Sequence, residues 1–281
     1  MHTTKYNITT FYDGVFNELQ ELLCYALREL GYTVFTSSRT IYTDAINIVF
    51  AAHTLGEKAK ELPNNVIIFN LEQLNLNDNV PAIVQWTKLY AELGKRFEIW
   101  DYNGKNLAFW QSIGVQAKLF EFGYQKELNR IYRPSQAEPV LQDIDVLSYG
   151  SINDRRRHIL NGLIERGLKV KHLFGVYGEE RDKWIARSKL VINIHQFSQS
   201  IFEVVRCSYL MNNGVPIVSE INPTTTIDPR FLNSIAAVPY DQLIDKCVEL
   251  VNDNLARQTL GYQALSNFSQ KPQFELLKPL L

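Results

Sequence analysis

The apolar positions of this chain form short β-rich runs that alternate with segments of helical spacing. Between residues 14 and 30, apolar side chains recur every three or four residues, which predicts a helix. Such alternation is typical of a parallel sheet with helices on both faces. In the first half we predict strands at 6–11, 32–36, 47–51, 66–70, 98–100 and 115–120, and helices at 14–30, 81–94 and 102–113.

The same alternation resumes at Asp145 and continues to Glu220, with glycine turns between strands and helices. Each strand delivers its glycine and polar residues at its carboxyl end. An open parallel sheet binds ligands at that end, against helix N-termini that favour anions. This pattern in the second half predicts a site for a phosphorylated ligand. We predict a last strand at 236–238 and helices at 241–253 and 254–268.

The length of 281 residues suits two domains, with 46% hydrophobic and 21% charged residues as in ordinary globular proteins. The polar, two-proline segment 134–139 is the best linker. We therefore predict domains at 1–133 and 134–268, and a tail at 269–281 that packs back on the N-terminal domain. The net charge of -1 gives no global attraction to nucleic acid or to anionic membranes.

The three cysteines are odd in number and far apart, and two of them fall in predicted helices. This favours buried free thiols in a reducing compartment. No CxxC or His/Cys cluster suggests zinc, and no Asp-x-Asp motif suggests another metal. The N-terminus lacks an apolar signal core, and no run approaches about 20 apolar residues. We predict a cytoplasmic protein without a transmembrane segment, a metal or a cofactor.

A basic run, Arg155 to His158, follows the turn at Gly150 and Ser151. Asn153 or Asp154 would cap the helix, so Arg155 and Arg156 fall in its first turn. Cations there oppose the helix dipole, and a bound anion would compensate through bidentate guanidinium contacts. The alternative is a solvated helix face with Asp154 and Glu165 as partners.

Two further turns carry candidate ligand contacts. Gly175 and Gly178 flank Tyr177 and would let the backbone approach a planar ligand or a phosphate, although a tight turn needs no ligand. His195 ends an apolar strand. It is either a site residue or a hydrogen-bonded core histidine. Phe197 lies in the next turn, and Ser198 or Ser200 would cap a helix that begins at Ile201.

Glu203 and Arg206 share a face of that helix. A simple intrahelical ion pair is the alternative to a functional role. Their flanking residues are apolar, however, and a charged pair on a buried helix usually serves a site.

In the first half, polar residues at strand ends offer a general base. The candidates are Asp13, His53 and Glu72. Asp13 has a rival role as a helix cap, and Glu72 could lie on a plain surface. Asp101 follows another strand, where we expect a cap for the next helix.

The second half resembles the donor-binding domain of the GT-B glycosyltransferase superfamily. In that superfamily a glycine after the first strand precedes, by six residues, a basic residue on the donor diphosphate, as Gly150 precedes Arg156 here. The Ala186–Val191 step and the Gly214–Val218 run also resemble the superfamily's motifs. The whole chain is similar to bacterial glycosyltransferase-like proteins with runs such as NLEQL, YGSINxRR, LFGVYGEERD and IFEVVRxSYL. One departure is Tyr209, which stands where many retaining members carry a ribose-binding glutamate, so both a ribose contact by Glu203 and the stereochemical course are left open.

The resemblance implies a GT-B fold, two Rossmann-like domains facing across a cleft. It implies a glycosyltransferase whose second domain binds a nucleotide diphosphate-sugar and whose first domain binds the acceptor, a glycan, a lipid-linked group, a protein or, against the near-neutral charge, DNA. The alternatives are a sugar-nucleotide epimerase, a catalytically idle nucleotide- or sugar-binding module, and a DNA-modifying glycosyltransferase. The expected substrate-binding residues are Gly150, Ser151, Arg155, Arg156, Gly175, Tyr177, His195, Phe197, Ser200, Glu203 and Arg206, and the expected catalytic ones Asp13, His53, Glu72 and Glu203.

Overall fold

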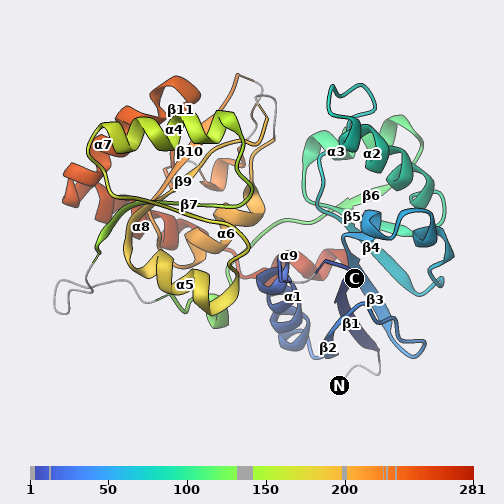
Figure 1. Ribbon diagram of the computed structural model, residues 1–281. Coiled ribbons are helices and arrows are strands. Elements are labelled where there is room, and N and C mark those ends of the chain that lie inside the picture. The colour runs from blue at the N-terminus through green and yellow to red at the C-terminus, as the bar shows by residue number, and fades with distance from the viewer. Residues whose placement is uncertain are drawn as a thin grey trace. The chain divides into compact units, whose positions relative to one another are not determined.

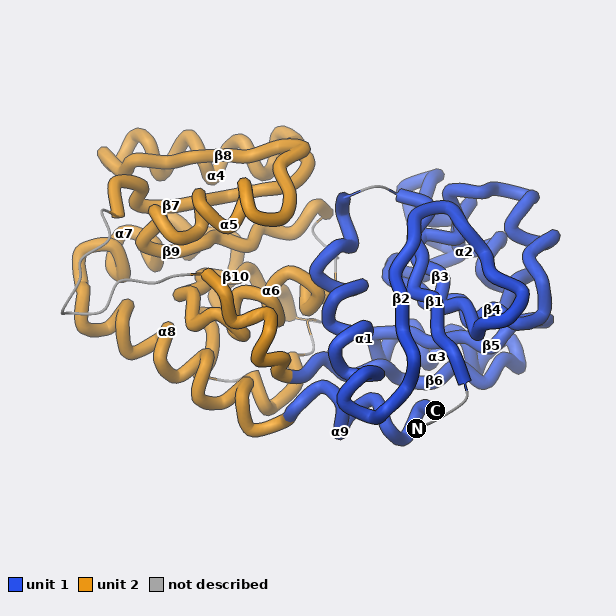
Figure 2. Tube along the Cα trace, turned by 90° about the horizontal axis from the view of Figure 1, so that it is seen from below, with its two compact units in different colours: residues 1–123, 272–281 blue, residues 124–271 orange. Residues whose placement is uncertain are grey.

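The computed structural model divides the chain into two compact units (Figure 2). Unit 1 comprises residues 1–123 and 272–281, and unit 2 comprises residues 124–271. The described residues are 4–12, 14–131, 142–197, 201–223, 225, 227–231 and 233–281. The predicted linker at 134–139 lies outside them, whereas the last ten residues of the chain belong to unit 1.

Unit 1 is built on a six-stranded sheet in which all strand pairs are parallel. The strand order is β2-β1-β3-β4-β5-β6. The chain passes from β1 to β2 at one edge of the sheet. It then crosses to the other side of β1 to form β3, so the strand order reverses between β1 and β3. The strands are β1 (Lys5–Thr10), β2 (Thr33–Ser38), β3 (Ile46–Phe50), β4 (Val66–Asn70), β5 (Glu98–Asp101) and β6 (Ala117–Leu119).

Helices cover both faces of this sheet (Figure 1). On one face α1 packs against α9, which comes from the end of the chain. On the other face α2, α3 and the 3-10 segment η1 close a core around Val49, Ile68 and Ile99, all fully buried. These elements are α1 (Asn17–Glu29), η1 (Ala52–Glu61), α2 (Pro81–Leu93), α3 (Gly104–Ser112) and α9 (Gln273–Leu277).

Unit 2 carries a five-stranded parallel sheet in the order β11-β10-β9-β7-β8. The order reverses between β7 and β9, as in other doubly wound sheets. The strands contribute Val146, Leu190, Ile192 and Val218 to one core cluster, which accounts for the apolar runs in the sequence. Buried polar residues such as Asn193 and Glu220 interrupt these runs. The strands are β7 (Ile144–Tyr149), β8 (Val170–Leu173), β9 (Ser188–Asn193), β10 (Ile217–Ile221) and β11 (Ala236–Pro239).

One face of this sheet is covered by α4 and α7, and the other by α5 and α6 (Figure 1). The α4 and α7 side forms a continuous core with the buried Leu163, Leu243 and Cys247. Helix α8 packs on α6 and α7. These helices are α4 (Asp154–Glu165), α5 (Gly178–Ala186), α6 (Val204–Asn212), α7 (Leu243–Asn252) and α8 (Asn254–Phe268).

Two helix starts lie three residues after the predicted ones. Helix α1 begins at Asn17 rather than Gly14, with Phe16 in the N-cap position and no side-chain cap. Helix α6 begins at Val204 rather than Ile201, with Glu203 in the N-cap position. Apolar periodicity predicted both helices, but periodicity does not mark the first turn when no side chain caps it.

The three cysteines are buried free thiols, as predicted. Within the described part of the chain, no helix combines the length and the apolar character needed to cross a bilayer.

Candidate functional site

The strand order of unit 2 reverses between β7 and β9, so the loops after these strands diverge to opposite faces of the sheet. This point is the usual ligand site of a doubly wound sheet. The loop after β7 contains Gly150 and Ser151, and the loop after β9 contains His195 and Gln196. Helix α4 starts beside them, and Asn153 caps it by accepting a hydrogen bond from the Arg156 N–H at 2.9 Å.

Arg156 bridges the two loops. Its Nε donates to the Ile194 carbonyl at 2.9 Å, and its Nη1 donates to the Ser151 carbonyl at 2.8 Å. The side chain is almost fully buried, with 5% exposed. Burial, followed by the nearby charge of Arg206, lowers the pKa of Arg156 to about 10. A buried cation next to a second cation is an arrangement that a bound anion would stabilise.

Arg206 from α6 reaches the same place. Its Nη1 donates to Asn193 Oδ1 at 2.9 Å, and its guanidinium lies 4.9 Å from the ring centre of Tyr149. Its Nε is buried and has no hydrogen-bond partner. The side chain does not pair with Glu203, contrary to the simple ion-pair alternative.

Gly150 is the point at which the two arginines meet. A Cβ atom at this position would lie 3.1 Å from Nη2 of Arg206 and 3.7 Å from Nη1 of Arg156. The residue has a φ of +112°, which side chains disfavour. The glycine therefore serves both the turn and the approach of two guanidinium groups to the backbone.

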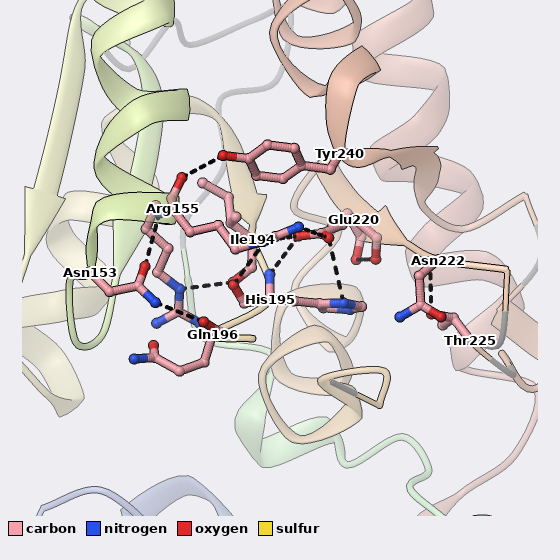
Figure 3. A network of polar contacts seen from close by, with 11 residues as sticks. Asn153, Arg155, Ile194, His195, Gln196, Glu220, Asn222, Thr225 and Tyr240 are labelled. Carbon is pink, nitrogen blue, oxygen red and sulfur yellow. Dashed lines mark hydrogen bonds and ion pairs between the residues drawn. The ribbon is translucent and has the colours of Figure 1, made fainter. Parts of the chain in front are cut away.

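Arg155 binds groups of the protein on the strand next to β9. Both of its Nη groups bond the carboxylate of Glu220, and its guanidinium lies 3.8 Å from the ring centre of Tyr240 (Figure 3). The Tyr240 hydroxyl in turn donates to the Arg155 carbonyl at 2.7 Å. Glu220 is 1% exposed and the Arg155 side chain is 21% exposed, so this largely buried ion pair fastens the start of α4 to β10.

His195 is fully buried next to this ion pair. Its backbone N–H donates to Glu220 Oε2 at 2.9 Å, and its Nδ1 lies 3.8 Å from Glu220 Oε1 (Figure 3). Neither ring nitrogen has a hydrogen-bond partner. Burial lowers the pKa of His195, against the opposing charge of Glu220, so the ring is neutral at pH 7. Two unsatisfied ring nitrogens are expensive in a core, which makes a simple core histidine an incomplete description.

The other predicted ligand residues of unit 2 lie in the loops after β7, β8 and β9. Ser151 Oγ donates to Gln196 Oε1 at 3.1 Å. Gly175 has a φ of +70° with open space at its Cβ position, so it serves its turn. Tyr177 and Phe197 are exposed to 37% and 40%, respectively. Ser200 lies outside the described residues.

Tyr209, the departure noted in the sequence, is a buried residue of α6. Its hydroxyl donates to Asp182 Oδ2 at 2.7 Å and accepts from Arg130 Nε at 3.1 Å. Burial is the main cause that raises the pKa of the Tyr209 hydroxyl. This side chain is a neutral, buried member of a Tyr–Asp–Arg cluster.

In unit 1 the structure brings two of the three base candidates together. His53 Nε2 lies 3.8 Å from Glu72 Oε1, and its Nδ1 lies 3.0 Å from the Tyr90 hydroxyl. The side chains of His53 and Glu72 remain 18% and 28% exposed. They follow β3 and β4, which are neighbouring strands of this sheet. Asp13, the third candidate, lies outside the described residues.

Several contributors to these clusters were not predicted from the sequence. Glu220 and Asn193 are polar residues inside apolar strands, and this interruption of the pattern is the signal that would have found them. Asp101, predicted as a helix cap, is the last residue of β5, and Asn103 caps α3 instead. In the described part of the chain, no three His, Cys, Asp or Glu side chains gather in a way that could hold a metal ion.

No protein-family model matches this chain. Uncharacterized protein L140 of Acanthamoeba polyphaga mimivirus is 27% identical over 214 residues, which cover 75% of this chain and 67% of that protein. Uncharacterized protein L137 of the same virus is 28% identical over 194 residues, covering 68% of this chain and 25% of that protein. The match to this chain thus spans two thirds of the length of L140 and one quarter of the length of L137.

Solved structures resemble the whole fold. Sucrose-phosphate synthase from Thermosynechococcus elongatus superposes with a TM-score of 0.64 at 11% identity, covering 98% of this chain and 97% of that one. Anabaena HepE in complex with UDP-glucose gives 0.62 at 12% identity, covering 98% and 99%. WaaG, a glycosyltransferase of lipopolysaccharide biosynthesis, gives 0.57 at 10% identity, covering 99% and 98%. The chain has the GT-B fold, as predicted.

Proposed function

We propose that this chain is a glycosyltransferase that takes its sugar from a nucleotide diphosphate-sugar bound by unit 2. The observation that carries the proposal is the convergence of the Arg156 and Arg206 guanidinium groups at Gly150, where the sheet order reverses. The protein contacts of these two guanidinium groups use only some of their N–H donors. The remaining donors suit the two phosphates of a diphosphate. Anabaena HepE, which shares the fold, has been solved with UDP-glucose.

The proposed chemistry breaks the bond between the sugar C1 and the diphosphate oxygen, and the electron pair leaves with the diphosphate. An acceptor oxygen forms the new bond to C1 and loses its proton. Fixed positive groups at the leaving oxygen stabilise the charge that develops there, which is a preorganised electrostatic effect. We assign this role to Arg156 and Arg206, with the start of α4 next to them. The unsatisfied ring of His195 is the further donor or acceptor for the sugar or the diphosphate.

Unit 1 supplies the acceptor side in this proposal. His53 and Glu72 are close to one another and partly exposed, so a hydroxyl group can reach them. Asp13 stays a candidate base. We propose that the reaction needs no metal ion, since arginines take the place of a divalent cation at the diphosphate.

The first prediction concerns Arg156→Ala. The loss of a charged hydrogen-bond donor of about 1.5–3 kcal/mol should weaken binding of UDP, GDP or ADP by roughly 10- to 150-fold. Isothermal titration calorimetry measures this change. Arg157→Ala is the matched control, because Arg157 is the next residue of α4 and its side chain is exposed and paired with Asp154. Equal affinity of the Arg156 and Arg157 variants would exclude the diphosphate assignment.

Turnover separates glycosyl transfer from the alternatives on the same fold. Slow hydrolysis of one nucleotide sugar to free sugar and nucleoside diphosphate, unchanged by EDTA, supports a metal-independent transferase. Epimer formation without an acceptor indicates an epimerase. Tight nucleotide binding with no turnover of any donor indicates a binding module.

A further inference from the structure

The carboxylate of Asp101 is the centre of a buried polar network in unit 1. Asp101 is fully buried at the end of β5. Its Oδ2 accepts hydrogen bonds from Asn70 Nδ2 and Trp110 Nε1, both at 2.7 Å. Its Oδ1 accepts from Asn106 Nδ2 at 3.0 Å and from the Asn103 N–H at 3.1 Å. Four donors offset part of the cost of burying a carboxylate.

Two of these donors also hold the backbone at Glu72. Asn70 Nδ2 and Asn106 Nδ2 both donate to the Glu72 carbonyl, at 2.9 and 2.8 Å. The Glu72 N–H donates to Asn70 Oδ1 at 3.1 Å, and the Leu74 N–H donates to Asn106 Oδ1 at 3.0 Å. Residues 72–74 are therefore fixed by the two amides that Asp101 orients.

A carboxylate at this position has a specific effect on those amides. It only accepts hydrogen bonds, so both asparagines must turn their N–H groups toward it. Their amide oxygens then face residues 72 and 74. The opposite end of the same sheet shows that a charge is not required to fix a loop, because Asn7, Asn47 and Asn65 form a network there by amides and backbone groups.

The side chain of Glu72 connects this network to His53, because its Oε1 lies 3.8 Å from His53 Nε2. Tyr90 is fully buried, and burial raises the pKa of its hydroxyl well above the ordinary value. The hydroxyl therefore stays protonated and can donate to His53 Nδ1, which places the imidazole proton on Nε2, toward Glu72. The loop that carries His53 is itself under constraint, since Ala51 adopts a φ of +54°.

We propose that Asp101 is a positioning residue, which holds the backbone at Glu72 and thereby keeps the Glu72 carboxylate beside the His53 ring. In the proposed function, this pair receives the proton of the acceptor. The catalytic purpose of this positioning rests on the proposed function. The positioning itself can be measured without a sugar donor, an acceptor or turnover.

The test is the pKa of His53, measured on the full chain by NMR titration of the imidazole signals, with His53→Gln as the assignment standard. Glu72→Gln removes a nearby negative charge and should lower the pKa of His53 by about half a unit or more. Asp101→Asn and Asn106→Ala should shift it in the same direction. Adding Glu72→Gln to Asn106→Ala should then produce a smaller further shift than Glu72→Gln in the wild type.

Asn47→Ala is the matched control, because it removes a buried amide from the network at the other end of the sheet. It should leave the pKa of His53 unchanged. The proposal is overturned when the Asn106 and Asp101 variants fold and keep the wild-type pKa of His53, or when Asn47→Ala shifts it equally. Asn106→Ala decides the outcome when Asp101→Asn does not fold. Failure of nucleotide binding to unit 2 would leave these results intact, so the two proposals fail separately.

Discussion

At the scale of single residues, this chain places charged groups in its interior and compensates them with fixed partners. Glu220 has Arg155, and Asp101 has four hydrogen-bond donors. Arg156 differs from both. Among its charged neighbours, a second arginine, Arg206, has the largest effect on its pKa. This imbalance is the reason why we propose a ligand site at Arg156 and only a structural role for the other two groups.

Asp101 gives a prediction for the pH dependence of stability. Burial raises its pKa in the folded protein to about 6, against an ordinary value near 4. A group with a raised folded pKa contributes stability below its unfolded pKa and loses that contribution as pH rises through the folded pKa. The stability of the wild type relative to Asp101→Asn should therefore fall between about pH 4 and pH 6, by on the order of 3 kcal/mol, and then stay level.

Urea unfolding of both proteins at several pH values from 4 to 7 measures this difference. A difference that is the same at every pH would contradict the raised pKa. A difference that grows with pH would mean that the four donors outweigh the cost of burial.

At the scale of elements, α4 is fastened to the sheet at its first turn. Asn153 caps the helix, Arg155 binds Glu220 of β10, and Arg156 spans the loops after β7 and β9. The helix therefore presents its N-terminus to the reversal point of the sheet in a fixed orientation. Such a helix start supports an anion without further rearrangement.

Glu220→Gln tests this attachment. Removing one partner of a buried ion pair leaves Arg155 uncompensated and should cost about 3–5 kcal/mol of stability. Urea unfolding checks the loss, and calorimetry should show weaker binding of nucleoside diphosphates. Asp245→Asn is the control, since Asp245 pairs with Arg166 near the other end of α4 but is exposed, and should cost less than about 1 kcal/mol. Similar losses in both variants would show that the Glu220 pair is no stronger than a surface contact.

Elements with strong patterns were predictable from the sequence, and details set by packing were not. The alternation of apolar runs and helical periods identified the strands of both sheets, and proline at the first turn correctly marked the start of α2. The start of α6 was misplaced because Ile201 and Phe202 are apolar and buried without being helical. Local sequence does not distinguish an apolar residue that is buried in a loop from one that is buried in a helix.

The candidate site was predictable only where residues follow strands. Gly150, Arg156, His195 and Arg206 were proposed from their positions, and the structure gathers them at or near one loop cluster. Glu220 comes from a strand that lies 65 residues after its partner Arg155 in the sequence. Pairing across the sheet brings these residues to the site, and a single sequence does not contain that pairing.

At the scale of the whole molecule, the chain leaves unit 1 after residue 123 and returns to it at residue 272. The returning segment is well anchored. Gln273 accepts from the Gly123 N–H at 2.7 Å and donates to the Glu121 carbonyl, and Lys118 Nζ donates to the Leu280 carbonyl at 2.8 Å. Leu277 is fully buried. The tail is thus a structural part of unit 1.

Leu277→Ala should destabilise unit 1 by about 2–5 kcal/mol through a cavity in its core. Scanning calorimetry should show a lowered transition for unit 1, while the affinity of unit 2 for nucleoside diphosphates is retained. Leu281→Ala is the control, because Leu281 is 41% exposed and should leave both properties unchanged. Loss of nucleotide binding in the Leu277 variant would show that the two units do not fold as separate structures.

The return of the chain to unit 1 also has a consequence for synthesis on the ribosome. Residues 124–271 emerge as one uninterrupted stretch, so unit 2 can fold as soon as they are free. Unit 1 begins first but lacks α9 until residues 272–281 have been translated. Until then, α1 lacks the helix that packs against it, so we expect chaperones to protect this N-terminal part of the nascent chain.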